Sequence, residues 1–91
     1  MSDVDISGGA WRWLVNNGCM TSGKPKPLAA WLWLWKRGLH ISIVEDDGEC
    51  VAWLPKELSW LEHTEKGDTP DDAIVRMIEF LSTNDIEVNG R

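Results

Sequence analysis

Four side chains could act as soft metal ligands or as thiol nucleophiles: Cys19, His40, Cys50 and His63. Zinc sites bring their ligands in closely spaced pairs, and no two of these residues lie close together in the sequence. Neither thiol follows a helix start or adjoins a histidine, the usual neighbours of a reactive cysteine. We therefore expect structural residues, no metal, no cofactor and no catalytic group. Two free thiols are favoured, with a Cys19–Cys50 disulfide as the alternative.

Acidic side chains offer a second kind of chemistry, because Glu45, Asp46, Asp47 and Glu49 gather around one predicted turn. A solvated turn is favoured over a metal site or an acid–base pair, since turns select Asp for its backbone geometry. Five further acids extend the group: Glu62, Glu65, Asp68, Asp71 and Asp72. Together they could form a continuous negative surface that binds a protein with a basic surface. An ordinary soluble acidic face is the alternative.

Tryptophan is unusually frequent, with seven in 91 residues. Trp buries a large area at low entropic cost and is enriched at interface hot spots. Trp31 and Trp35, at helical spacing, are predicted to belong to the core. The other five cannot all be buried in so small a domain, so we expect one or two in an exposed patch or a homodimer contact. These five are Trp11, Trp13, Trp33, Trp53 and Trp60.

The bulk composition indicates one α+β domain over residues 1–91, with 1–26 expected to be partly flexible. Formal net charge is −6 and unevenly placed. Residues 1–38 carry five Lys/Arg against two Asp, or +3, and residues 39–91 carry four against thirteen Asp/Glu, or −9. This balance argues against nucleic acid as the main partner. No run is long enough to cross a bilayer and no signal-peptide pattern opens the chain, so we expect a cytoplasmic protein.

Two helices are predicted in the first half of the chain. Ser7 can cap the first and Gly18 can stop it, with Trp11, Leu14 and Val15 on one face. The second covers residues 27–37, because proline suits the first helical position and glycine suits the position after the last. Its apolar stripe would comprise Leu28, Trp31, Leu32 and Trp35. A buried strand is the alternative for this segment.

The second half predicts an antiparallel sheet of three to four strands. Asp47-Gly48 is a two-residue hairpin signal and sets the register. The predicted opposing pairs are Asp46 with Glu49, Val44 with Val51, Ile43 with Ala52, and Ile41 with Leu54. One face would then carry Leu39, Ile41, Ile43, Ala52 and Leu54, and the other His40, Ser42, Val44, Val51 and Trp53. Residues 59–65 are predicted as a third strand, with Trp60 and Leu61 on opposite faces, and residues 86–88 as a short last strand.

The strongest local signal begins a helix over residues 68–83. Thr69 is its predicted cap, Pro70 its first residue, and Asp71 and Asp72 favour the positive end of the helix dipole. Its buried stripe is expected to contain Ile74, Met77, Ile78 and Leu81, widened by Ala73 and Phe80.

The segment Leu39-His-Ile-Ser-Ile-Val-Glu-Asp-Asp-Gly-Glu-Cys-Val-Ala-Trp-Leu-Pro, followed by Gly67-Asp-Thr-Pro-Asp-Asp-Ala-Ile, resembles the HicB-type module. Residues 39–88 follow its order of strands and helix. The resemblance implies an antitoxin that neutralises an RNA-cleaving toxin. Its packing would place the late helix on one sheet face and leave the Trp53 face to a partner.

A second resemblance covers residues 27–83. Lys36-Arg-Gly38, the hairpin and Asp68-Thr-Pro-Asp-Asp-Ala-Ile74 are similar to small α–β–α sandwich proteins of tailed phages. This resemblance implies that the 27–37 helix covers the face of Val44, Val51 and Trp53. It carries no assigned chemistry.

The favoured hypothesis is a non-enzymatic protein-binding module of phage or mobile-element type that binds, and through binding inhibits, a host protein. A HicB-like antitoxin and a virion assembly protein are the alternatives, and a homodimer is compatible with each. The candidate partner-binding residues are Trp53, Trp60, Glu45, Asp46, Asp47, Asp71 and Asp72.

Overall fold

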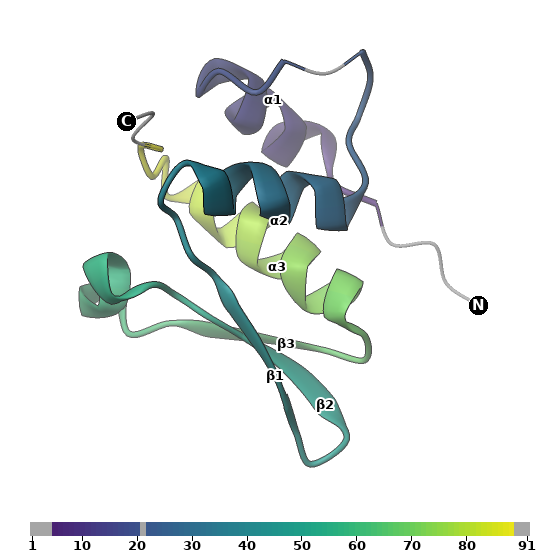
Figure 1. Ribbon diagram of the computed structural model, residues 1–91, viewed down its shortest axis with the longest axis vertical. Helices are drawn as coiled ribbons and strands as arrows, with labels where there is room; N and C mark the ends of the chain where they lie inside the picture. The colour runs from purple at the N-terminus through teal and green to yellow at the C-terminus, as the bar shows by residue number, and fades with distance from the viewer. Residues whose placement is uncertain (1–4, 21, 89–91) are drawn as a thin grey trace.

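The computed structural model describes residues 5–20 and 22–88 and shows an α+β fold, as predicted. Three antiparallel strands form one sheet in the order β1-β2-β3, and α3 lies between this sheet and α1 (Figure 1). The elements in chain order are α1 (Gly8–Asn16), α2 (Pro27–Lys36), β1 (Ser42–Asp46), β2 (Glu49–Trp53), the 3-10 helix η1 (Lys56–Leu61), β3 (Thr64–Gly67) and α3 (Pro70–Thr83).

Helix α3 is the centre of the core, and its start is confirmed. The Thr69 hydroxyl accepts the Asp72 N–H at 3.1 Å, and Pro70 occupies the first turn. Gly67 permits the close approach of β3, since a Cβ there would lie 2.7 Å from the Ala73 nitrogen. The helix packs against β2 and β3 with one face and against α1 and α2 with others. Its buried residues are Ala73, Ile74, Val75, Met77, Ile78 and Leu81.

The hairpin is confirmed with its predicted register. Asp46 pairs with Glu49, Val44 with Val51, and Ile43 with Ala52, while the ladder ends one pair short of the predicted Ile41–Leu54 pair. The turn residues have φ of 56° at Asp47 and 83° at Gly48. Two consecutive positive φ values are typical of a type I′ turn, whose twist matches that of the flanking strands.

The predicted third strand is displaced. Residues 56–61 form η1, and β3 begins only at Thr64, so Trp60 and Leu61 lie outside the sheet. Pro55 ends β2, and Glu62 has a left-handed conformation (φ 48°) that turns the chain back for Thr64 to pair with Trp53. The sequence prediction took the apolar residues of a short helical turn for strand alternation.

The predicted last strand is also wrong, because the sheet has three strands in the part of the chain that is described. The segment at 86–88 bonds to α1 instead. The Trp13 indole N–H donates to the Ile86 carbonyl at 2.8 Å, and the Val88 N–H donates to the Asn17 side-chain oxygen at 2.9 Å. The side chains of Trp13 and of Asn17, the C-cap residue of α1, thus satisfy backbone groups that a strand would have offered to a neighbour.

Both N-terminal helices form where predicted, with Ser7 capping α1 by accepting the Ala10 N–H. The buried face of α1 is rotated from the predicted one and keeps only Leu14 of it fully buried, and that of α2 is a different face. In α1 the buried aromatic is Trp13, held by its bond to Ile86, while Val15 is exposed. In α2 the buried residues are Pro27, Ala30 and Leu34. The small Ala30 lets α2 pack closely on α3, since interhelical distance depends on the side chains at the contact.

The α–β–α sandwich packing is not found. Helix α2 contacts α3 and has no close backbone approach to any described strand. On the sheet face away from α3, Val44 is 50% and Trp53 51% exposed, although Val51 between them is buried. No helix or strand of the described chain forms a second layer over this face of the sheet.

Candidate functional site

The residues with chemical potential are dispersed. Cys19 is buried, Cys50 is half-buried, and both are free thiols. Burial raises the pKa of the Cys19 thiol, an effect partly opposed by the charge of Arg37. His63 bonds to Glu65 and stacks on Phe80 with ring centroids 3.6 Å apart. Over residues 5–20 and 22–88, no three His, Cys, Asp or Glu side chains gather closely enough to hold a metal ion.

An exposed apolar stripe on α2 is the most prominent surface feature. Leu28, Leu32 and Trp35 are 54%, 44% and 41% exposed. Trp31 is half-buried beside them, with its ring centroid 5.2 Å from that of Trp35. These four residues are the stripe that the helical spacing indicated, but Leu28, Leu32 and Trp35 are exposed, whereas Trp31 is partly buried and packs against the core. The prediction that Trp35 belongs to the core was therefore wrong, and that for Trp31 holds in part.

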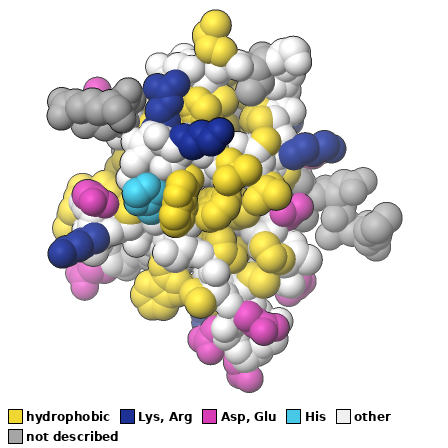
Figure 2. All heavy atoms as spheres, viewed as in Figure 1, with side chains coloured by type: hydrophobic (Ala, Val, Ile, Leu, Met, Phe, Trp, Pro, Cys, Tyr) yellow, Lys and Arg dark blue, Asp and Glu magenta, His cyan; other side chains and the backbone are white. Residues whose placement is uncertain are grey.

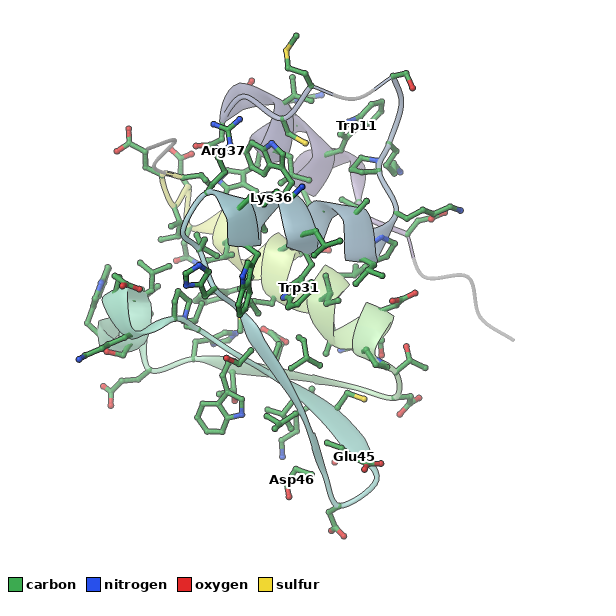
Figure 3. All side chains as sticks on the ribbon, in the orientation of Figure 1. Trp11, Trp31, Lys36, Arg37, Glu45 and Asp46 are labelled. Carbon is green, nitrogen blue, oxygen red and sulfur yellow. The ribbon has the colours of Figure 1, made fainter. Side chains whose placement is uncertain are left out.

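This stripe adjoins the β-hairpin. The Trp31 indole N–H donates to the Ile41 carbonyl at 2.7 Å, just before β1, and the side chain reaches from α2 toward the strand (Figure 3). Figure 2 shows hydrophobic side chains over α2 and again over the hairpin on the same broad face. We call this the α2–hairpin surface. It comprises Leu28, Trp31, Leu32, Trp35, Val44 and Trp53.

The size of the α2–hairpin surface can be compared with ordinary protein surfaces. The exposed fractions correspond to roughly 450 Å² of apolar area, at about 150–250 Å² for a whole large side chain. The largest apolar patch of a typical monomer measures about 300–600 Å² and often serves a function. An interface of standard size buries about 800 Å² per partner, somewhat over half of it apolar. The area is therefore sufficient for the apolar part of one such interface.

Opposite charges border the α2–hairpin surface. Lys36 and Arg37 lie at the α2 end, and Arg37 sits 4.9 Å above the Trp33 ring. Glu45 and Asp46 lie near the hairpin turn and point to opposite sides of it (Figure 3). The backbone of an antiparallel ladder requires this, because successive side chains alternate between faces.

Only part of the second predicted acidic group, Asp68, Asp71 and Asp72, lies at the turn end of the sheet, because Glu62 precedes Thr64, which pairs with Trp53 at the other end. Cys50 pairs with both Glu45 and Gly67, so the turn and the start of α3 are neighbours. Asp71 is exposed there. Asp72 already has partners within the fold, since its carboxylate accepts the Asp68 N–H and the Arg76 Nε–H, each at 3.2 Å. Asp72 thus stabilises the start of α3, in line with its predicted place in the first turn of that helix.

The two predicted aromatic contacts differ in their surroundings. Trp53 lines a depression of ≈ 320 Å³ with Ser59 and His63 among its neighbours. Trp60 is 69% exposed on η1 and does not line this depression. The expectation that one or two of the five remaining tryptophans are exposed is confirmed by these residues.

Sequence reasoning missed Leu28, Leu32 and Trp35 as surface residues. The available signal was that α2 is apolar on all sides: Trp33 and Leu34 continue around the helix. A helix of that kind must be buried all round or must leave apolar area open. In a chain of 91 residues the first solution needs more surrounding protein than the fold supplies.

Comparison with known protein families, with curated proteins and with solved structures finds no match for this chain. No helix in the described ranges is long and apolar enough to cross a membrane. The function must therefore be inferred from the surfaces of the molecule itself.

Proposed function

We propose that this chain is a non-enzymatic protein-binding module that recognises its partner through the α2–hairpin surface. The observation that carries this proposal is the outward position of Leu28, Leu32 and Trp35 on a helix whose small residue Ala30 faces the core. Exposed apolar area of this extent costs solubility without contributing to the fold. A partner that covers it would recover the hydrophobic free energy.

The charges at the hairpin favour a partner with a basic surface. Glu45, Asp46, Asp47 and Glu49 surround the turn, and Asp71 lies at the same end of the sheet. Such an arrangement accelerates association with a cationic partner and disfavours anionic ones, nucleic acid included. A host protein is the target that we propose, with inhibition as the expected result of binding.

A HicB-like antitoxin is the second candidate. The specific observation in its favour is that α3 covers one face of the sheet while Trp53, on the other face, stays exposed. Co-expression with an RNA-cleaving toxin tests this candidate. A stable complex that suppresses RNA cleavage would support it, and unchanged cleavage would exclude it.

The proposal is tested by affinity capture from a bacterial lysate with the full chain and two matched variants. Leu32→Lys places a charge in the α2–hairpin surface, and Val15→Lys places the same charge on α1, where Val15 is 49% exposed. Both are surface changes, so circular dichroism and urea unfolding should match the parent chain. We expect a specific partner to be retained by the parent and by Val15→Lys and to be lost with Leu32→Lys.

Two further variants test whether Trp53 or Trp60 contributes to partner binding. Trp53→Ala removes part of the α2–hairpin surface, whereas Trp60→Ala removes an exposed ring outside it. Loss of the partner with Trp53→Ala and retention with Trp60→Ala is the expected pair of results. A partner that is indifferent to both Leu32→Lys and Trp53→Ala would contradict the proposal.

A further inference from the structure

Strand β1 forms a free edge of the sheet, because the strand order is β1-β2-β3. The two-residue turn fixes which backbone groups face outward. In such a hairpin Asp46 and Glu49 exchange hydrogen bonds, and every second pair beyond them does the same. The N–H and C=O groups of Ile43 and Glu45 therefore point away from β2.

The outward-facing backbone groups of Ile43 and Glu45 have no partner in the part of the chain that is described. Ile41, just before β1, faces the same way, and its carbonyl accepts the Trp31 indole N–H at 2.7 Å. This bond shows that a donor approaching from the α2 side can reach the edge. Outside the β1–β2 ladder, no described residue bonds to the backbone of Ile43 or Glu45.

Helix α2 lies beside the β1 edge, where it could pack over a strand added to the sheet, but its backbone does not closely approach any strand of the described chain. Helices of α+β folds pack their apolar stripe on a sheet. The α2 stripe lies on the side of β1, where Trp31 reaches the strand, yet no strand passes beneath it (Figures 1 and 3). A segment added at the β1 edge would run past Trp31 with one row of side chains and continue the face of Val44 with the other.

At the end near the hairpin turn, the charges of β1 determine which side chains an added segment should carry. Glu45 and Asp46 point to opposite faces of the hairpin, so both side-chain rows of an added strand would meet a carboxylate near the turn (Figure 3). Basic residues complement these positions. A second copy of the chain fits poorly, because β1 has two carboxylates and no cation to offer.

We propose that the β1 edge accepts an extended segment of a partner protein as a fourth strand, apolar beneath α2 and basic beside the Asp47-Gly48 turn. This inference rests on the proposed function and adds the mode of recognition. Backbone hydrogen bonds to Ile43 and Glu45 provide affinity, and the α2–hairpin surface and the acidic turn select the side chains.

The test is a selection from a displayed library of random peptides against the full chain. We expect the retained peptides to share an apolar run adjoining a pair of Lys or Arg residues. A representative synthetic peptide is then titrated against variants at Glu45. Glu45→Pro removes the outward N–H, whereas Glu45→Gln removes the charge and keeps the N–H.

A proline on the opposite edge of the sheet is the matched control. Lys66 pairs with Val51 and so directs its own N–H outward from β3, which makes Lys66→Pro an equivalent backbone change away from α2. We expect Glu45→Pro to weaken peptide binding by about tenfold or more, Glu45→Gln by a smaller factor, and Lys66→Pro not at all. Unfolding curves and circular dichroism confirm that each variant is folded.

The outcomes separate this inference from the proposed function. Equal binding by Glu45→Pro and Glu45→Gln, with loss of binding by Leu32→Lys, would overturn strand addition and leave the α2–hairpin surface as the recognition site. Selected peptides without the apolar and basic segments would also overturn it. Indifference of the peptide to all these variants would count against both.

Discussion

Helices α2 and α3 carry apolar stripes of similar spacing, yet one stripe is exposed and the other is buried. In α3, Ile74, Met77 and Ile78 are almost fully buried against the sheet and the other helices. In α2, Leu28 and Leu32 face outward while Ala30 and Leu34 make the contact with α3. The α3 stripe thus serves folding, whereas the α2 stripe is left largely exposed and only Trp31 of its four residues packs against the core.

The ends of the two helices show the same contrast. The hydroxyl of Thr69 caps α3, and two aspartates follow in its first turn. Helix α2 begins after Lys26 with no side-chain cap and no acid in its first turn. Local signals for helix formation are therefore concentrated in α3. Helix α2, in contrast, carries more apolar side chains than its packing against α3 buries.

The largest effect is expected in the buried stripe. Ile78→Ala should lower the free energy of unfolding by about 2–5 kcal/mol, because it removes fully buried methyl groups and leaves a cavity in the core. Urea unfolding followed by tryptophan fluorescence measures this loss. A loss below about 1 kcal/mol would contradict the central place given to α3.

An intermediate effect is expected at the caps. Thr69→Ala should cost about 1 kcal/mol, since the Asp72 N–H loses its acceptor. Lys26→Ala, at the corresponding position of α2, should change the free energy of unfolding by less than about 0.5 kcal/mol. Thr69→Ser, which keeps the hydroxyl, serves as the control. Equal costs for Thr69→Ala and Lys26→Ala would remove the contrast between the helix starts.

The smallest effect on stability is expected in the exposed stripe. Leu32→Ala should change the free energy of unfolding by no more than about 0.5 kcal/mol, because nearly half of this side chain is already in water. The same urea experiment compares it directly with Ile78→Ala. A loss of several kcal/mol would show that the α2 stripe belongs to the core after all.

Much of the fold could be predicted from local signals in the sequence. The turn at Asp47-Gly48 determined the hairpin register, and the Thr69 cap determined the start of α3. These features depend on a few neighbouring residues and their backbone geometry. The segments at 59–65 and 86–88 were mispredicted because their structure depends on distant partners, such as the bond from Trp13 to Ile86.

The candidate site was only partly predictable for the same reason. Trp53 and the acids at the turn follow from the hairpin register, so their exposure could be anticipated. The outward face of α2 could not, because periodicity identifies an apolar stripe without stating which side meets the core. That choice depends on α3 accepting Ala30 and Leu34, a contact between helices far apart in the sequence.

Amide hydrogen exchange of the full chain, measured by NMR with and without a selected peptide, tests most directly whether the corner between α2 and β1 is an open binding site. In the free protein we expect the N–H groups of Ile43 and Glu45 to exchange fast and that of Val44, which faces β2, to exchange slowly. Saturating peptide should slow Ile43 and Glu45 by at least about tenfold and leave Lys66, on the other edge, unchanged. Protection of Ile43 and Glu45 already in the free protein, or no change on saturation, would contradict the account.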